Sequence, residues 1–478
     1  TRLEIYKLPQ DDEKTYDIIS RGETIGTFQI ESRAQIASVL HTRPDRLYDL
    51  VVQVALIRPG PIQARFVHPY TRRRRGLEKV TYAHPDLEPI LKRTQGIPIF
   101  QEQAMAIAMT LGGYSAAEAD ELRRTMGHIR KVEKLMRVLE QLRARMIGRG
   151  IAEGVARKIA EDLLSFANYG FPESHAWSFA LISYATNYLK AHYPAEFYAG
   201  LLNSWPMGFY PPSTLIHDSR RHGLRVLPPC MRDGDWECTV ETLDDPDRPA
   251  MRIGWRHIRG LGEKTLLALK GARAGSTFTS IADVIHRASL NRPDALNLAR
   301  AGAFDRWEPD RRRAAWKAMR IVGDDLPLAP AREAPYTPRP LTRDELIFLD
   351  YFAFGASVNG HPMEHLRPGL RDEGALDSRE LSNLRGGEAI VTAGLVTIRQ
   401  QPQTANGTVF LLMEDEFGFI NVIVPRKMVE ENVEVVRFST FVVVRGRFER
   451  DGGVMNVVGE GFRDLPVKSL VHHSRDFH

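Results

Sequence analysis

Two hydrophobic patterns occur along the chain, and each predicts a different kind of structure. Across roughly the first 210 residues, apolar positions recur at intervals of three and four, which is typical of amphipathic helices. One helix is expected after Ser115, because Ser115-Ala116-Ala117-Glu118 has the form of a capping box, in which both side chains satisfy free amides. Further helices are predicted over residues 132–147, 151–168 and 174–192. In the last of these a stripe of large side chains shares one face, and we interpret it as core: Trp177, Leu181, Tyr184 and Tyr188.

Residues 386–462 change to alternating apolar and polar positions, the pattern of strands. The predicted strands cover residues 389–398, 408–414, 419–424, 440–449 and 454–458, with a short helix at 426–431 between the third and the fourth. Turn residues at Asn406-Gly407 and at Asp451-Gly452-Gly453 separate them. Five strands with a helix in that place predict an OB-fold barrel, an architecture that commonly binds oligonucleotides.

The middle of the chain has weaker patterns. Prolines and an acidic loop mark a connecting region after residue 210, and helical segments follow to about residue 307. Residues 321–343 are rich in proline and have little periodicity, so we interpret them as a linker. The predicted fold class is therefore multidomain α+β. Its expected parts are a mainly helical domain at 1–210, a helix-hairpin-helix domain at 211–310, a linker and connecting region at 311–385, the OB-fold at 386–465 and a tail at 466–478.

Composition excludes several classes of protein. With 43% hydrophobic and 26% charged residues the chain is typical of folded globular protein, and no apolar run is long enough to span a bilayer. No leader-like segment is present, and the two cysteines, Cys230 and Cys238, cannot form a disulfide framework or complete a zinc site. We therefore expect a cytoplasmic protein. The net charge of +5, with arginines in clusters, favours a polyanionic partner.

Basic residues gather in two neighbouring segments. Arg58-Pro59-Gly60-Pro61 holds an arginine at a rigid corner, where a guanidinium loses little entropy on binding a phosphate. Arg72, Arg73, Arg74 and Arg75 follow, and four consecutive arginines cannot all be neutralised locally, so a nucleic-acid backbone is a natural counterion. A turn with a solvated arginine and a solvated basic loop are the alternatives.

The sequence Gly260-Leu261-Gly262 lies between predicted helical segments and is followed by Lys264 and Thr265. This is the pattern of a helix-hairpin-helix, in which glycines let backbone amides face a DNA phosphate without regard to base sequence. A Gly-x-Gly pair alone is weak evidence, and its neighbours strengthen the prediction of DNA contact.

Carboxylates suited to metal-dependent nucleotidyl transfer are not found. That chemistry needs acidic residues on a rigid strand that hold two metal ions about 4 Å apart. The two Asp-x-Asp patterns, Asp233/Asp235 and Asp245/Asp247, lie in segments rich in glycine and proline. We therefore expect no metal-binding and no catalytic residue in this chain.

Several segments, in order and over nearly the whole chain, resemble one family, the C-family bacterial DNA polymerases (DNA polymerase III alpha-like). They begin with Gly26-Thr27-Phe28-Gln29-Ile30-Glu31-Ser32-Arg33, Ala55-Leu56-Ile57-Arg58-Pro59-Gly60-Pro61 and Phe100-Gln101-Glu102-Gln103. They continue with Leu122-Arg123-Arg124-Thr125-Met126-Gly127, Tyr169-Gly170-Phe171-Pro172-Glu173-Ser174-His175, Leu189-Lys190-Ala191-His192-Tyr193-Pro194-Ala195-Glu196-Phe197 and Ala301-Gly302-Ala303-Phe304-Asp305. The resemblance implies that residues 1–210 form the fingers domain, with the end of the palm at its start.

The resemblance also implies roles for individual residues. Those expected near the incoming nucleotide or the primer–template are Arg58, Arg123, Arg124, Ser174 and His175. The helix-hairpin-helix would hold duplex DNA, and the barrel would lie near single-stranded template. Phe410, Phe417 and Phe419 of the barrel are candidates for stacking on bases, with barrel core as the favoured alternative.

In this family the metal-binding aspartates belong to the palm, and no position here matches them. Mg²⁺ is therefore expected for the full-length enzyme, with no ligand from this chain, and the chain alone is expected not to polymerise. The first interpretation is the fragment of a DNA-directed DNA polymerase, with the aspartates encoded upstream. The alternatives are a non-catalytic DNA-binding protein built from the same parts, or the replicative alpha subunit.

Several segments resemble the error-prone branch of the family, which acts in damage-induced mutagenesis and translesion synthesis. They include Gly208-Phe209-Tyr210, Arg220-Arg221-His222-Gly223 and Asp235-Trp236-Glu237-Cys238. The implied partners are primer–template DNA, single-stranded template and deoxynucleoside triphosphates. A sliding clamp or other mutagenesis proteins remain open, since Asp325-Leu326-Pro327-Leu328-Ala329 lacks the leading glutamine and terminal phenylalanine of a clamp motif.

Overall fold

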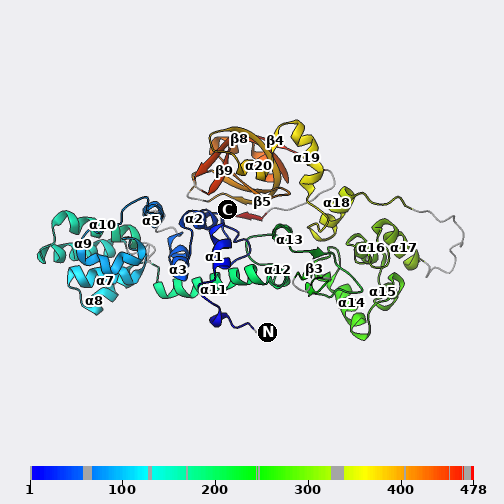
Figure 1. The fold of residues 1–478 in the computed structure, drawn as a ribbon, viewed down its shortest axis with the longest axis horizontal. Helices are drawn as coiled ribbons and strands as arrows, with labels where there is room; N and C mark the ends of the chain where they lie inside the picture. The colour runs from blue at the N-terminus through cyan, green and yellow to red at the C-terminus, as the bar shows by residue number, and fades with distance from the viewer. Residues whose placement is uncertain are drawn as a thin grey trace. The chain divides into compact units, whose positions relative to one another are not determined.

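The chain forms two compact units, Thr1–His192 and Tyr193–His478, in a computed structural model (Figure 1). The structure describes all residues except 1–2, 58–66, 127–131, 168–170, 244, 246–247, 324–337, 403–404, 452, 466, 468–474 and 478. Among the described residues, no helix combines the length and the apolar character needed to cross a bilayer.

The first unit contains two clusters of helices. The first cluster contains α3, whose residues Leu50, Val51 and Val52 are fully buried, and α2 and α11 pack against that helix. It consists of α1 (Glu13–Ser20), α2 (Arg33–Thr42), α3 (Leu47–Leu56), α5 (Val67–Arg74) and α11 (Glu173–His192), with the short η1 (Ile5–Lys7) at the start of the chain. Since α11 lies more than 100 residues after α3, this core closes only through a long-range contact.

The second cluster is made of consecutive helices: α6 (Glu88–Leu91), α7 (Gln101–Gly112), α8 (Ala116–Thr125), α9 (Val132–Gly148) and α10 (Glu153–Ala167), with η2 (Pro85–Leu87) and η3 (Lys92–Thr94). The capping box at Ser115 is confirmed, because Glu118 Oε2 accepts from the Ser115 amide at 2.8 Å and Ser115 Oγ accepts from the Glu118 amide at 3.4 Å. The helices α9, α10 and α11 agree with the segments predicted from periodicity.

The aromatic stripe on α11 is only partly core. Tyr184 is buried, and Trp177 and Tyr188 pack at the edge of the same cluster. Leu181 is 42% exposed, so the interpretation as core is wrong for this residue.

Segments far apart in the first unit meet on α11. The Ser183 hydroxyl donates to the Phe28 carbonyl at 2.6 Å, and Lys190 Nζ donates to the Ile25 carbonyl at 2.9 Å. In the turn that they hold, Glu31 Oε2 accepts from the Gly26 amide at 3.0 Å. The sequence Gly26–Arg33, noted for its family resemblance, therefore serves to seat this turn on α11.

The arginine run is less free than its sequence suggests. Arg74 is 13% exposed, and its Nη2 lies 2.6 Å from Asp49 Oδ2 and 3.0 Å from Asp45 Oδ1. Arg73 donates to Glu78 Oε1 and to the Gln95 carbonyl, both at 2.9 Å. Carboxylates outside the run therefore neutralise Arg73 and Arg74, whereas Arg72 and Arg75 remain exposed.

The second unit begins with helices and a small sheet that the sequence patterns did not predict. Its first elements are α12 (Pro194–Asn203), α13 (Pro212–Arg221), and the strands β1 (Val226–Leu227), β2 (Thr239–Glu241) and β3 (Ala250–Arg252), arranged in the order β1-β3-β2. Then follow η5 (Trp255–His257), α14 (Glu263–Gly275), α15 (Ile281–Arg287), α16 (Arg292–Arg300) and α17 (Arg311–Gly323). Trp255, which is fully buried, donates its indole N–H to the Cys230 carbonyl at 2.8 Å and so fixes η5 on the preceding segment.

The segment predicted as a linker and connecting region contains well-defined helices. They are α18 (Arg343–Phe354), α19 (Pro362–Asp372) and α20 (Ser378–Ser382), with the strand β4 (Ala375–Leu376) beside the barrel. The helix α18 begins with a capping box, in which Thr342 and Glu345 satisfy each other's amides. Most of the proline-rich sequence, residues 324–337, lies outside the described residues, as does the clamp-like segment at 325–329.

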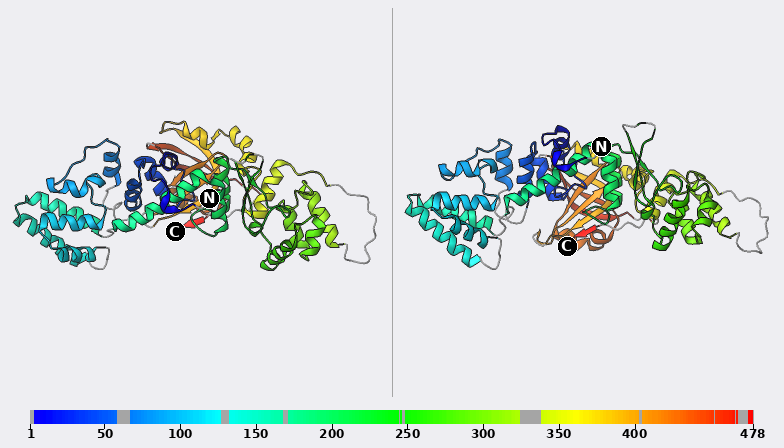
Figure 2. Two further views of the ribbon diagram at one scale, coloured as in Figure 1. Left: turned by 60° about the horizontal axis from the view of Figure 1, so that its bottom comes forward. Right: turned by 90° about the horizontal axis from the view of Figure 1, so that it is seen from below.

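The five predicted strands form a closed barrel. They are β5 (Ala389–Gln400), β6 (Val409–Glu414), β7 (Phe419–Val424), β8 (Phe441–Asp451) and β9 (Val454–Asp464). Neighbours pair in the order β5-β6-β7-β9-β8, and β8 returns to pair with β5, which closes the ring. The strands run side by side in both further views (Figure 2).

The barrel is filled by aliphatic side chains, among them Leu411, Val422 and Val444. The helix α21 (Arg426–Glu431) has the predicted bounds and is followed by α22 (Val433–Phe438). The predicted tail contains β10 (Arg475–Phe477), which pairs in parallel with β5.

Replacement of Arg74 by alanine should destabilise the chain strongly. It would leave the Asp49 carboxylate, whose side chain is 5% exposed, without its closest cation, and burial already raises the pKa of Asp49. Removing one partner of a buried ion pair typically costs about 3 kcal/mol or more. Urea unfolding of Arg74→Ala should show this loss, whereas the exposed neighbour Arg75→Ala should stay within about 0.5 kcal/mol of the parent. Equal effects of the two substitutions would contradict a structural role for Arg74.

Candidate nucleic-acid interface

The predicted nucleotide contacts Ser174 and His175 lie at the start of α11, and both are exposed. The segment before them is tied to the start of α7. The Gln101 amide donates to the Phe171 carbonyl at 3.1 Å, and Glu102 Oε2 accepts from the Glu173 amide at 2.9 Å. Free amides at a helix N-terminus favour an anionic ligand, so the predicted residues stand where a phosphate could be bound.

A network around Glu173 positions this end of α11. Glu173 Oε1 accepts from the Tyr48 hydroxyl at 3.2 Å and from Arg93 Nη2 at 3.1 Å, and the Arg93 guanidinium lies 4.7 Å from the centre of the Tyr48 ring. The ring of His175 lies between Phe171 and Phe179, with centroid distances of 5.1 and 4.1 Å. Nothing in the sequence pattern singled out Tyr48 or Arg93, because they come from distant segments.

The other predicted pair, Arg123 and Arg124, lies in the last turn of α8. Both contact Asp120 at 2.8 Å, and their side chains are 40% and 74% exposed. Exposed ion pairs are worth little, so a phosphate can replace this carboxylate as a partner. The described hydrogen bonds and ion pairs do not join these arginines to Ser174 or His175. The link between the two sites is α7, which packs against α8 and meets the start of α11.

Of the remaining predicted cations in the first unit, two are available. Arg72 is 59% exposed and contacts Glu78 only at 3.4 Å, and Arg75 is exposed as well. Arg73 and Arg74 are committed to the contacts described above. Arg58 lies outside the described residues.

In the second unit, the predicted glycine loop connects η5 to α14. Gly260 has φ +78°, a left-handed conformation that favours glycine, and a Cβ at this position would meet the end of the Asn297 side chain at 2.5 Å. Gly262 is the N-cap of α14, with open space around it, and Lys264 is exposed beside it. Thr265 has a structural contact, since its hydroxyl donates to Asp294 Oδ2 on α16 at 2.7 Å. Exposed amides, a lysine and a bare glycine backbone can accept a phosphate there.

The three barrel phenylalanines are partly buried, and they are not among the buried residues of the barrel core. The Arg379 guanidinium lies 3.2 Å from the centre of the Phe417 ring, and that of Arg221 lies 4.5 Å from the centre of the Phe419 ring. The guanidinium groups cover one face of each ring, and Arg221 is itself paired with Glu414 and Asp218.

The Asp-x-Asp patterns do not form a metal-binding pair among the described residues. Asp233 lies in a turn, 3.7 Å from Arg232 and 3.9 Å from Arg306, and Asp235 Oδ1 accepts from the Trp236 amide at 2.6 Å. Asp247 lies outside the described residues. The two thiols are free and buried, and burial raises the pKa of Cys238 to about 11, so it is an inert thiol.

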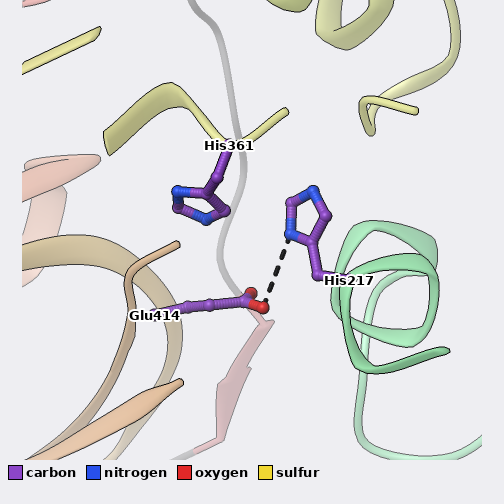
Figure 3. A group of neighbouring side chains, drawn as sticks. All are labelled: His217, His361 and Glu414. Atoms are coloured by element: carbon purple, nitrogen blue, oxygen red, sulfur yellow. Dashed lines mark ion pairs between the residues drawn. The ribbon is translucent and has the colours of Figure 1, made fainter. Parts of the chain in front are cut away.

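Three side chains of the kinds that can bind a metal ion do lie close together in the described part of the chain: His217, His361 and Glu414 (Figure 3). No sequence pattern indicated this group, because its members come from three segments far apart and have no ligand spacing.

Comparison with known proteins supports this organisation. The family model for the bacterial DNA polymerase III alpha subunit finger domain matches residues 1–150, and the model for the helix-hairpin-helix motif matches residues 223–314. The error-prone DNA polymerase of Anaeromyxobacter dehalogenans (strain 2CP-C) is 44% identical over 483 residues, which cover 98% of this chain and 42% of that relative. Those of Pseudomonas fluorescens (strain Pf0-1) and Pseudomonas aeruginosa (PAO1) are each 42% identical over all of this chain and 47% of the relative.

A finger domain, a helix-hairpin-helix segment and a closed barrel, in this order, define part of a C-family bacterial DNA polymerase, and the chain belongs to that family. Within the family, the relatives named above are all error-prone DNA polymerases, which confirms the predicted branch. The chain spans less than half the length of the curated relatives that it matches.

Acid should weaken the second unit through His257, which precedes the glycine loop. Burial, and then the charge of Arg256, lowers the pKa of His257 to about 4. Below about pH 6.5 the histidine of the unfolded chain binds a proton, whereas the buried His257 of the folded chain does not. The contribution of His257 to the unfolding free energy is therefore fully present above about pH 6.5 and is lost as the pH falls toward 4. Between pH 7 and pH 5 we expect this residue to cost about 2 kcal/mol of unfolding free energy.

The measurement is urea unfolding at both pH values, followed by tryptophan fluorescence. His257→Gln should reduce the pH dependence, and the control His286→Gln, an exposed histidine on α15, should leave it unchanged. The same pH dependence in all three proteins would contradict the assignment to His257.

Proposed function

We propose that this chain is the nucleotide- and primer–template-binding part of an error-prone DNA polymerase that acts in damage-induced mutagenesis and translesion synthesis. The observation that carries the proposal is the identity of 42–44% along essentially the whole chain to proteins of that name. The substrates on this proposal are deoxynucleoside triphosphates and a primer–template, and the place of action is the bacterial cytoplasm.

The fingers would bind the incoming nucleotide. Arg123 and Arg124 supply exposed guanidinium groups, and Ser174 and His175 stand beside the free amides at the start of α11. Charge that develops on a departing pyrophosphate is stabilised by such positioned cations and donors. Arg58 would join them, on the strength of the family resemblance alone.

The second unit would hold the DNA. The loop at Gly260 and Gly262, with Lys264, suits the phosphates of a duplex, because backbone amides contact them without reading sequence. The barrel would lie near single-stranded template, with the partly buried Phe410, Phe417 and Phe419 as the candidates for stacking on bases. A clamp or other mutagenesis protein as partner stays a prediction, since the segment concerned lies outside the described residues.

Two-metal chemistry would need Mg²⁺ and clustered carboxylates. The described carboxylates do not fit this need, since Asp233 and Asp235 face arginines and a backbone amide in a turn. We therefore propose that the metal-binding aspartates of the full-length enzyme come from a segment outside this chain. This chain itself would bind and orient the substrates without catalysing the transfer.

The lack of a fitting carboxylate pair among the described residues also favours a second candidate, a non-catalytic DNA-binding protein. One experiment separates the two: primer extension with Mg²⁺ and all four deoxynucleotides, by this chain and by the product of its complete gene. The first candidate expects DNA binding by both and extension only by the complete product. Extension by neither would leave the DNA-binding protein, and extension by the chain alone would reveal a metal site here, with Asp233 and Asp235 as the first residues to replace.

Arg123→Ala should reduce nucleotide incorporation by the complete enzyme more than it reduces DNA affinity. A positioned guanidinium on a transferring phosphate typically contributes about 100-fold or more in rate. Single-turnover incorporation and DNA binding are measured on the same preparation, with Arg137→Ala, an exposed arginine on α9, as control. Equal losses in rate and affinity would contradict a role at the nucleotide.

The exposed members of the arginine run should contribute to DNA affinity without regard to sequence. Arg72→Ala with Arg75→Ala should flatten the dependence of log affinity on log salt by about 2, since each phosphate contact contributes about 0.9. Arg157→Ala, a 68% exposed arginine on α10, is the control for a general loss of charge. An unchanged slope in the double variant would remove these arginines from the interface.

A further inference from the structure

Three buried side chains converge in the second unit, each from a different element (Figure 3). His217 lies on α13, His361 is the N-cap of α19, and Glu414 ends β6. Their exposures are 4%, 3% and 0%, and one ligand atom from each lies within 4.8 Å of the others. Neither the family models nor the roles proposed above assign a function to this group.

Hydrogen bonds leave two ring nitrogens in this group unsatisfied. His217 Nδ1 and His361 Nε2 are buried and have no hydrogen-bond partner. The other nitrogens are engaged, since His217 Nε2 lies 3.4 Å from the Tyr351 hydroxyl and His361 Nδ1 accepts from the Met363 amide at 3.1 Å. Buried polar atoms without partners are costly, so two of them facing one carboxylate indicate a group that binds between them.

The separation of two of the ligand atoms fits a shared metal ion better than a direct contact. His217 Nδ1 lies 3.4 Å from Glu414 Oε1, longer than a charge-assisted hydrogen bond of about 2.8 Å. Two ligands on a tetrahedral Zn²⁺ with bonds of about 2.05 Å stand about 3.3 Å apart. The observed separation therefore matches the edge of such a site.

The protonation states are compatible with coordination, at some cost. Burial lowers the pKa of His217 and of His361 well below the ordinary value, so both rings are neutral at pH 7 and each carries a lone pair. Coordination through His361 Nε2 places the ring proton on Nδ1, and the Met363 amide then loses its acceptor. The free energy of metal binding has to exceed the cost of losing this hydrogen bond at the start of α19.

Charges around the group also bear on affinity. Arg221 Nη1 contacts Glu414 Oε1 at 2.7 Å, its Nη2 lies 3.6 Å from the buried Asp218, and the Thr214 hydroxyl is 3.4 Å from Glu414 Oε2. The two carboxylates are balanced by the guanidinium groups of Arg221 and Arg220, so the surroundings offset little of the charge of a dication. Arg221, with Arg220 nearby, holds the affinity below that of sites made of thiolates.

We propose that His217, His361 and Glu414 bind one divalent transition-metal ion of the zinc class. Imidazole nitrogen with a carboxylate selects Zn²⁺ over Mg²⁺, so this site is distinct from the Mg²⁺ of nucleotidyl transfer. The ion fastens α13 and the start of α19 to the last residue of β6. The proposal does not depend on the polymerase activity.

The test uses the full chain, stripped of metal with a chelator and then titrated with Zn²⁺ against a chromophoric competitor. One Zn²⁺ per chain should bind and raise the unfolding temperature. His217→Gln and His361→Gln should each weaken binding by about 10-fold to 100-fold or more, the loss typical of residues that support a metal site. The control is His365→Gln, which replaces an exposed histidine on α19, the helix that begins after His361. This variant should keep the parent affinity.

A second measurement needs no variant. Co²⁺ added to the stripped parent chain should give the intense visible absorption of a tetrahedral site, and Zn²⁺ should abolish it. Absence of this band together with absence of Zn²⁺ binding would overturn the proposal and leave a buried water as the occupant. Binding that survives in folded His217→Gln or His361→Gln would overturn it as well.

Discussion

Buried guanidinium groups and the carboxylates that neutralise them are the constraint on which the packing of this chain depends. Arg74 on α5 meets Asp49 on α3, and Arg311 on α17 meets Asp350 on α18 at 2.5 Å. Likewise Arg367 on α19 meets Glu416 after β6 at 2.7 Å. Each pair joins two elements in one orientation, because any other orientation would leave a charge buried alone. Such pairs add little net stability compared with apolar packing, and they specify which surfaces meet.

Sequence patterns predicted the local structure well and the long-range structure poorly. The helices α9 and α11, the helix α21 and the five barrel strands follow from periodicity, which depends only on neighbours along the chain. The small sheet was missed because strands of two or three residues have no period to detect. The helix α18 was missed although its capping box, Thr342 to Glu345, was present in the sequence. The prolines before it led to the interpretation of the whole segment as a linker.

The candidate sites show the same division. Gly260 and Gly262 could be recognised because a tight loop demands particular residues at particular positions. The different environments of Arg72 and Arg74 could not be recognised, since Asp49, the partner of Arg74, lies 25 residues away in the sequence. The group formed by His217, His361 and Glu414 is the extreme case, because only the folded second unit brings its members within reach of one another.

The closed barrel has a consequence for the order in which the chain can be assembled. The strand β5 pairs with β6, close behind it, but also with β8, where Ala389 stands opposite Arg447. During synthesis, β5 therefore has one unpaired edge until β8 has emerged, some fifty residues later, and pairings this distant form slowly. The barrel is thus a late-folding part of the chain, and during that interval its exposed edge is the place where self-association is most readily started.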